Sequence, residues 1–338
     1  MNKVFQKLSY DAFTPRCEVL TGSRILSRTG LVFDLRWIWR TVYRNPIVIA
    51  RATAISLLSL VRRGVRPTAQ HRQFGLVHSV WTLGYYHWLT ESLPRALILR
   101  QAFPDAVPLL PSRRYEGYVG SLKALGFDDV AFFPDGSNAL VENPVVTECA
   151  AQFATTEPAL LLAVRDRVKL GLGVVPAHVP FRRVYVSRRK SRGRFVRNEE
   201  EVVQFLAKAG FEEVCFEDLS FEAQVRLMDE TRVLISIHGA ALTNMMFMPP
   251  GGSILELLPQ KNGIFDYNIV RNSFRHDPCY VRLAQAMGHV HSFLECRAVR
   301  GLFKGTHMAD IYVDIASMAL KMQERGICAK GSLHEASE

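Results

Sequence analysis

The stretch RVLISIHGAALTNMMFMPPGGSILELLP, residues 232–259, decides the fold of this chain. Its pattern predicts a buried strand, a tight turn, a short helix and a second apolar strand, at residues 233–237, 238–240, 241–247 and 253–258. This order is typical of a doubly wound sheet, in which ligands lie beyond the carboxyl ends of the strands. The turn is therefore a candidate phosphate site, because a helix N-terminus presents free N–H groups and a positive dipole end to an anion.

The turn consists of small residues that follow a histidine. Gly239, Ala240 and Ala241 let a ligand approach the backbone closely, whereas larger side chains would stand in the way. The alternative is a compact strand-to-helix turn that only packs His238. Polar residues expected at the same edge of the sheet favour the ligand site.

Length and composition describe a globular protein of two domains. A chain of 338 residues is long for one hydrophobic core, and contents of 48% hydrophobic and 10% aromatic residues exclude a disordered chain. The six cysteines are scattered without a close pair, which indicates reduced thiols in a cytoplasmic compartment. The first residues lack the apolar region of a secretory signal.

The formal charge of +10 lies entirely in residues 1–72, a basic N-terminal segment with 13 Lys and Arg against 3 Asp and Glu. Within it, residues 35–66 mix arginines with tryptophans and aliphatic residues. The apolar run 46–61 is short for a membrane span and contains Arg51, so an amphipathic helix on an anionic membrane surface fits better. A helix packed on the body with solvated arginines is an equal alternative. Nucleic acid is disfavoured, since no binding motif accompanies the segment.

Strands and helices alternate in two further regions, residues 73–172 and 173–325, before a tail at 326–338. Two such runs predict an α/β fold of two Rossmann-like, doubly wound domains that face a cleft. Gly171 and Gly173 are expected to form the link between the domains.

Helix caps punctuate the second region. Asn198, with Glu201 three residues on, and Ser220 are expected to cap helices. A further helix is expected over residues 266–287 and a strand over 289–296.

Two polar residues are expected at the ligand edge of the second domain. Arg188 is the first basic residue after a strand predicted at 183–187, where its guanidinium would suit phosphate oxygens. Glu256 interrupts the second apolar strand and could accept hydrogen bonds from ribose hydroxyls. The alternatives are a solvated basic loop and a carboxylate that faces water.

His87 and Glu91 share one face of a helix predicted over 85–103, which is bent or restarted at Pro94. A histidine is the usual general base near neutral pH, and a carboxylate one turn away can orient it. A buried histidine on a capped helix is the commoner meaning of this spacing. No cluster in the sequence assembles a metal site.

With these features together, the chain resembles glycosyltransferase family 61, which includes bacterial capsular-polysaccharide proteins and eukaryotic xylosyl- and N-acetylglucosaminyltransferases. The matching stretches are YYHWLTESLPR (85–95), VYVSRRK (184–190), RNEEEVV (197–203), LSFEAQVRLM (219–228) and ISIHGAALTNMMFMPPGGSILELLP (235–259). The segment before residue 72 has no counterpart in the family pattern.

The resemblance implies a GT-B-like fold and transfer of a sugar from a nucleotide-sugar donor, with inversion and without a bound metal or other cofactor. A UDP-sugar is the expected donor. By the same resemblance the donor-side motifs contain Arg188, His238, Gly239, Ala240 and Asn244, with Glu256 in the strand that follows, and the acceptor-side motif contains His87 and Glu91.

The leading interpretation is a cytoplasmic glycosyltransferase at the inner face of the plasma membrane, which builds a cell-surface polysaccharide on a glycan or lipid-linked acceptor. A non-catalytic scaffold protein of the same fold is one alternative. A Rossmann oxidoreductase is a second, disfavoured because no G-x-G-x-x-G opens either alternating region.

Overall fold

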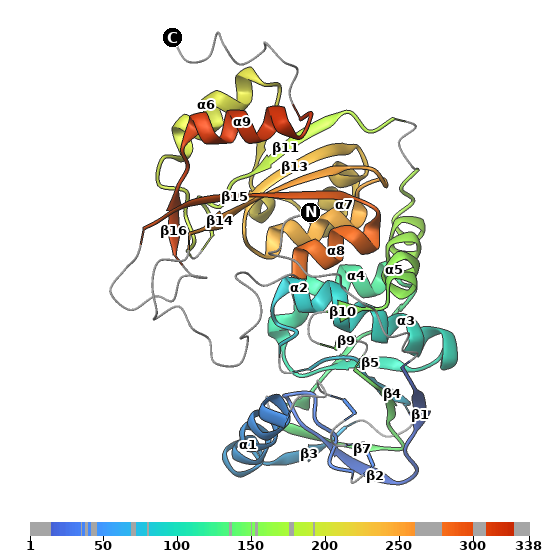
Figure 1. The fold of residues 1–338 in the computed structure, drawn as a ribbon. Helices are drawn as coiled ribbons and strands as arrows, with labels where there is room; N and C mark the ends of the chain where they lie inside the picture. The colour runs from blue at the N-terminus through green and yellow to red at the C-terminus, as the bar shows by residue number, and fades with distance from the viewer. Residues whose placement is uncertain are drawn as a thin grey trace. The chain divides into compact units, whose positions relative to one another are not determined.

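The computed structural model describes residues 15–327 of the chain, apart from residues 35, 38–39, 42–45, 69–71, 80, 135–136, 150, 153–154, 176–178, 192, 261–278 and 300–308. The chain divides into two compact units: residues 10–174 form the N-terminal unit, and residues 175–338 with 1–9 form the C-terminal unit. Both units are mixed α/β structures (Figure 1).

The C-terminal unit is built on a six-stranded sheet in the order β12-β11-β13-β14-β15-β16. The strands are β11 (Arg182–Val186), β12 (Glu212–Val214), β13 (Thr231–Ile237), β14 (Ser253–Pro259), β15 (Val290–Val299) and β16 (Asp310–Tyr312). All pair in parallel except β16, which is antiparallel to β15. This is the flavodoxin-like strand order, and the direction of winding reverses between β11 and β13.

Helices cover both faces of this sheet (Figure 1). They are α6 (Glu199–Lys208), α7 (Phe221–Asp229), the 3₁₀ helices η4 (Phe216–Asp218) and η5 (Ala240–Phe247), α8 (Cys279–Met287) and α9 (Ile315–Glu324). Helices α6 and α9 lie on one face, where their apolar side chains form a core with Leu255 and Leu257 of β14. Side chains alternate along a strand, so Glu256 points to the other face, that of α7 and α8.

Most elements expected in this region are confirmed, including the two strands around the turn and the cap of α7, where the Ser220 hydroxyl accepts from the Ala223 N–H. Asn198 is the N-cap residue of α6 as expected, and its amide nitrogen donates to Glu201 Oε2 at 3.0 Å, but its side chain makes no capping hydrogen bond to a backbone N–H of the helix. Its amide oxygen accepts from the backbone N–H of Val313 at 3.0 Å, and its amide nitrogen donates to the Val313 carbonyl at 2.8 Å. The side chain therefore ties the start of α6 to the chain after β16. Of the helix expected over 266–287, the first part lies outside the described residues.

The N-terminal unit contains a five-stranded sheet, β1-β8-β4-β5-β6, and a three-stranded sheet, β2-β7-β3. The strands are β1 (Cys17–Val19), β2 (Ser23–Leu26), β3 (Val65–Pro67), β4 (Phe74–Leu76), β5 (Val107–Leu110), β6 (Ala131–Phe132), β7 (Asn138–Glu142) and β8 (Val145–Thr147), with a separate pair β9 (Ala151–Gln152) and β10 (Thr155–Thr156). Strands β8, β4, β5 and β6 are parallel. Apolar side chains from both sheets, among them Leu26, Leu76, Leu109 and Val141, form one core.

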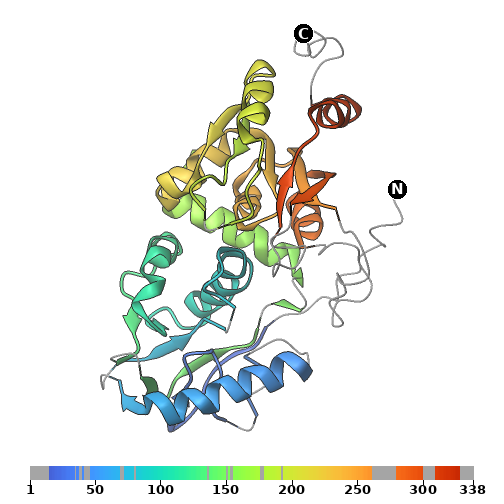
Figure 2. The same ribbon diagram turned by 90° about the vertical axis from the view of Figure 1, so that its left-hand side faces the viewer.

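Helices lie on one side of the five-stranded sheet, and the three-stranded sheet with α1 lies on the other (Figures 1 and 2). The helices of this unit are α1 (Pro46–Arg63), α2 (Tyr85–His87), the π-helix η1 (Trp88–Ser92), α3 (Leu93–Ala102), the 3₁₀ helix η2 (Arg113–Tyr118), α4 (Val119–Ala124) and α5 (Pro158–Gly171). Gly171 belongs to α5, where a Cβ atom would lie 1.9 Å from the Ala124 carbonyl oxygen. This glycine therefore permits close packing of α5 on α4.

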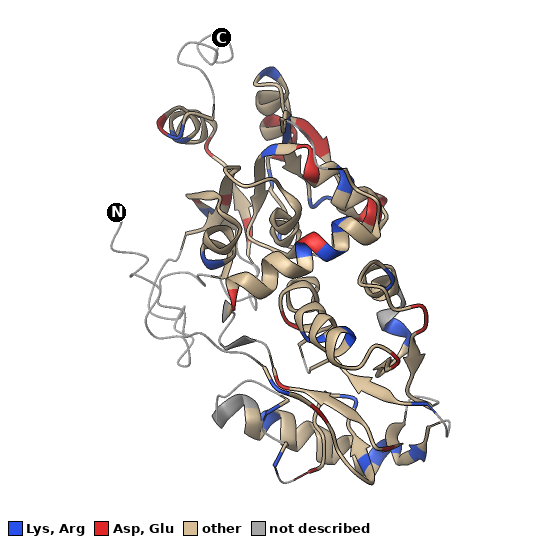
Figure 3. Ribbon diagram, turned by 90° about the vertical axis from the view of Figure 1, so that its right-hand side faces the viewer, with Lys and Arg blue, Asp and Glu red and all other residues tan. Residues whose placement is uncertain are grey.

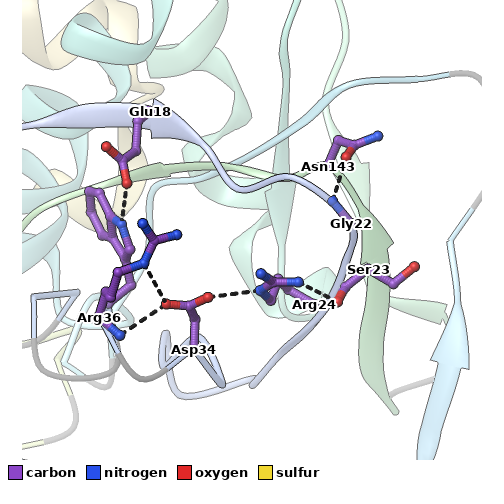
Figure 4. A network of polar contacts seen from close by, with 8 residues as sticks. Glu18, Gly22, Ser23, Arg24, Asp34, Arg36 and Asn143 are labelled. Carbon is purple, nitrogen blue, oxygen red and sulfur yellow. Dashed lines mark hydrogen bonds and ion pairs between the residues drawn. The ribbon is translucent and has the colours of Figure 1, made fainter.

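Part of the basic N-terminal segment is integrated into this unit, since β1, β2 and β3 pair with β8 and β7. Asp34 organises the loop after β2: its carboxylate accepts from Arg24 Nε at 2.9 Å and from the Arg36 backbone N–H at 3.0 Å (Figure 4). Nearby, Trp37 Nε1 donates to the Glu18 carboxylate at 2.6 Å. Some of the excess arginines thus have structural partners.

The helix expected over 85–103 is present but changes its winding. Residues 88–92 are π-helical, so the Leu93 N–H donates to the carbonyl of Trp88, five residues earlier. Pro94 lies in the first turn of α3 but inside the continuous helical stretch 85–102, so it cannot donate to the Thr90 carbonyl, which accepts from the Thr156 hydroxyl at 2.5 Å instead. Single π turns are frequent at functional sites.

Candidate functional site

Two guanidinium groups gather at the turn after β13, next to the point where the sheet reverses its winding. Arg188 follows β11, and its guanidinium lies against Gly239 so closely that a Cβ atom there would be 2.4 Å from Nη1. Its Nη2 donates to the Gly193 carbonyl at 3.3 Å. Arg194 Nη1 donates to the His238 carbonyl at 3.0 Å. The expected phosphate site therefore has two cations at the carboxyl ends of β11 and β13.

The charge of Arg188 is only partly balanced, since Glu217 acts on it without forming an ion pair. Burial, and then the neighbouring cation of Arg194, lower the pKa of Arg188. Within the described parts of the chain, neither guanidinium forms an ion pair, and the buried Nε of Arg188 makes no hydrogen bond. An anion at this place would offset the repulsion between the two guanidiniums and would accept hydrogen bonds from their N–H groups.

A buried carboxylate joins two histidines on the α8 side of the sheet. Glu256 Oε1 lies 2.5 Å from Nδ1 of His238, and Oε2 lies 2.9 Å from Nε2 of His291. Burial alone would raise the pKa of Glu256, but the hydrogen bonds and charges of the two imidazoles hold it at about 2. The ring of Tyr280, from α8, meets that of His238 edge to face at 5.2 Å. The arrangement fixes the orientation of His238 at the turn.

The remaining residues expected in this unit occupy defined positions. Ala240 is the first residue of η5, and Gly239 before it has an extended backbone, φ 170°. Asn244 is fully buried within η5 and donates to Gln224 Oε1 of α7 at 3.0 Å. Ribose binding by Glu256 stays a prediction; both of its oxygens are engaged by histidines.

In the N-terminal unit, His87 and Glu91 meet as expected. His87 Nδ1 lies 2.5 Å from Glu91 Oε1, and the carboxylate is buried while the histidine side chain is 32% exposed. A carboxylate on Nδ1 selects the tautomer whose basic lone pair is on Nε2. The indole of Trp81 lies beside the imidazole, with ring centres 6.3 Å apart. The pair has the features of an oriented general base.

One turn further along, Arg95 is buried at the carboxyl ends of β4 and β8. Nη1 donates to the His78 carbonyl at 2.9 Å and Nη2 to the Thr147 carbonyl at 2.7 Å, with longer bonds to the carbonyls of Thr41 and Leu76. In the N-terminal sheet, β5 and β6 follow on one side of β4, whereas β8 adjoins β4 on the other side. The direction of winding therefore reverses between β4 and β8. The guanidinium therefore fills the edge at which a doubly wound sheet usually accepts a ligand.

Within the described residues, no group of three or more His, Cys, Asp or Glu side chains is placed to hold a metal ion. The Glu256 cluster does not converge on one point, because the carboxylate lies between the two imidazoles.

Comparison with known proteins places these residues in a family. A family model described as Glycosyltransferase 61 matches residues 85–255, half of the chain. The chain belongs to glycosyltransferase family 61. For this family 61 protein, the matched region begins at α2 and ends within β14, so it includes His87, Glu91, Arg188 and the turn after β13.

Several curated relatives of the family 61 protein are glycosyltransferases by name. Protein O-linked-mannose beta-1,4-N-acetylglucosaminyltransferase 2 of Canis lupus familiaris is 35% identical over 74 residues, 21% of this chain and 13% of that protein. Xylan glycosyltransferase MUCI21 of Arabidopsis thaliana is 36% identical over 76 residues, which are 22% of this chain and 15% of that protein. The EGF domain-specific O-linked N-acetylglucosamine transferase of Drosophila melanogaster is 33% identical over 124 residues, which are 36% of this chain and 21% of that protein. The matches thus span between 13% and 21% of the length of these relatives.

Four residues of these clusters were not among the expected site residues. His291 could have been paired with Glu256 only by knowing the register of β14 on β15, and Tyr280 only by knowing how α8 packs. Arg194 belongs to the basic loop after β11, but the sequence does not distinguish it from the other arginines of that loop. Arg95 had a signal, since an arginine four residues after Glu91 lies on the same helix face.

Proposed function

We propose that this protein transfers a sugar from a nucleotide-sugar donor, a UDP-sugar, to a glycan or lipid-linked acceptor of a cell-surface polysaccharide, with inversion and without a metal. The observation that carries the proposal is the seating of the Arg188 guanidinium on Gly239, beside Arg194, at the reversal of winding. Membership of family 61 supports the class of reaction.

On this proposal the donor's diphosphate is bound by the C-terminal unit. The guanidiniums of Arg188 and Arg194 approach the phosphate oxygens, and the small residues before η5 let the backbone N–H groups do the same. Cations placed where the leaving diphosphate gains charge stabilise the transition state, which is the role of a metal in other transferases. His238, held by Glu256, limits the shape of this seat.

The acceptor is activated by the N-terminal unit. Nε2 of His87 takes the proton of the acceptor hydroxyl while Glu91 stabilises the resulting imidazolium. The acceptor oxygen forms a bond to the anomeric carbon as the bond from that carbon to the diphosphate breaks, so one displacement inverts the configuration. This step requires a GT-B-like closure of the two units, which is part of the proposal, as is a cytoplasmic location at the inner face of the plasma membrane.

Donor binding and turnover together test this function. The full chain is titrated by calorimetry with UDP, GDP, CMP, ADP and NAD in the presence of EDTA, and donor consumption is then followed with glycan and lipid-linked acceptors. Binding of one nucleoside diphosphate that is lost in Arg188→Ala, together with release of that diphosphate on turnover, is expected. Binding of NAD alone, or binding without any turnover of sugar conjugates, would overturn the proposal in favour of an oxidoreductase or a scaffold protein.

A further inference from the structure

Helix α1 has apolar side chains on its exposed side and mostly small or polar side chains on the side that packs against the protein. Three large apolar side chains face solvent: Leu57 is 51% exposed, Leu58 47% and Val61 85%. The side toward the body carries Ala52 and Ser56, which are fully buried. A helix that only covered a core would point its leucines inward. The described residues leave this exposed row uncovered, which is typical of a surface that contacts a partner.

Hydrogen bonds and the packing of Ile49 against Leu31 and Ala52 hold the inner side of α1. The Ser56 hydroxyl donates to the Ala52 carbonyl at 2.7 Å and forms a hydrogen bond with the hydroxyl of Thr29. One turn later, the Ser59 hydroxyl donates to Asn138 Oδ1, on β7, at 3.1 Å. The exposed leucines can thus be changed without loss of the contacts that fix the helix.

The charge around this apolar row has one sign. No acidic residue occurs between Asp34 and Glu91. Arg51, Arg62 and Arg63 of α1 are exposed, and Figure 3 shows basic but no acidic positions on the helix. Arg62 and Arg63 take part in no ion pair with the described residues. A partner that combines an apolar interior with a negative surface complements both properties.

We infer that α1 lies on an anionic lipid bilayer, with Leu57, Leu58 and Val61 at the boundary between head groups and acyl chains and the arginines at the phosphates. No helix of the described residues is long and apolar enough to cross a membrane, so the helix lies in the plane of the surface. Each partly exposed leucine loses water contact on insertion, and each arginine near the surface adds electrostatic attraction. Such binding needs no transferase activity and can be measured without substrate.

Vesicle sedimentation of the full chain tests the inference. Wild-type protein is expected to bind phosphatidylcholine vesicles that contain phosphatidylglycerol, to bind pure phosphatidylcholine weakly, and to be released by high salt. Combined Leu57→Ser and Leu58→Ser should lower the partition coefficient about tenfold or more. The matched control, Leu170→Ser on α5, removes a leucine that is 68% exposed and should bind as the wild type does.

Three outcomes would overturn the inference. The first is equal sedimentation of wild-type and doubly substituted protein, provided that both have the same thermal midpoint. The second is equal binding to neutral and anionic vesicles, which would remove the role of the arginines. The third is a concentration-dependent dimer that the double substitution abolishes, because a second copy would then cover the helix.

Discussion

Replacement of Gly239 by alanine is expected to weaken donor binding without unfolding the protein. The new methyl group would lie 2.4 Å from Nη1 and 3.3 Å from Cζ of Arg188, so the guanidinium must leave its seat. The end of an arginine is flexible, and the extended backbone at residue 239 accommodates any side chain. The damage should therefore be confined to the position of one cation.

The size of the effect follows from the bond that is lost. A hydrogen bond between a charged donor and a phosphate oxygen contributes about 1.5–3 kcal/mol, which corresponds to a loss of affinity of about 10- to 150-fold. The thermal midpoint should stay close to that of the wild type, because the Gly193 carbonyl that Arg188 leaves still accepts from the Ser191 hydroxyl at 3.0 Å.

Calorimetric titration of the donor nucleotide into Gly239→Ala, Arg188→Ala and the double variant measures this. Because both substitutions act on the same guanidinium, their effects should not add, and the double variant should bind as Arg188→Ala does. Gly120→Ala, at a glycine with open space around its Cβ position, is the matched control. Additive losses, or wild-type affinity in Gly239→Ala beside a weakened Arg188→Ala, would refute the close approach as the cause.

Three further predictions concern the other clusters. His87→Ala and Glu91→Gln should lower kcat about 10²–10⁴-fold in steady-state assays and leave the calorimetric Kd of the donor unchanged; a parallel loss of donor affinity would contradict an acceptor-side base. The low folded pKa of Glu256, about 2 against an ordinary 4.5, stabilises the protein fully above about pH 5 and progressively less as the pH falls toward 2. In urea titrations at several pH values, Glu256→Gln should remove up to about 3 kcal/mol of this dependence, and an unchanged pH profile would exclude the carboxylate as its source. Gly171→Ala should lower the free energy of unfolding by about 1–3 kcal/mol through the clash with the Ala124 carbonyl; stability equal to that of the Gly120→Ala control would argue against it.

Local spacing was enough to predict the features that depend on one element. Strands β13 and β14 follow from the unbroken apolar runs on either side of the turn, and His87 meets Glu91 because residues four apart share a helix face. The restart predicted at Pro94 is present, because α3 begins at Leu93, but the sequence did not predict that residues 88–92 before it would be π-helical.

Features that depend on distant pairing were out of reach. Strand β1 has three residues and pairs with β8 about 130 positions later, so its short pattern in a basic segment carries no strand signal of its own. His291 reaches Glu256 through the register of β14 on β15, and the side chain of Asn198 pairs with the Val313 backbone instead of with a backbone N–H of α6 because tertiary packing brings that backbone close. In each case the competing contact is non-local.

The buried position of Arg95 has a consequence for how the two sheets differ. Its guanidinium donates to carbonyls at the ends of both strands that flank the reversal of winding in the N-terminal unit. The chain's own arginine thus occupies the edge at which a doubly wound sheet usually binds a ligand, and a nucleotide phosphate would have to displace a guanidinium whose two Nη groups already donate to carbonyls. The two sheets differ in this respect, because at the corresponding edge of the C-terminal sheet two guanidiniums, of Arg188 and Arg194, lie close enough for the second to lower the pKa of the first.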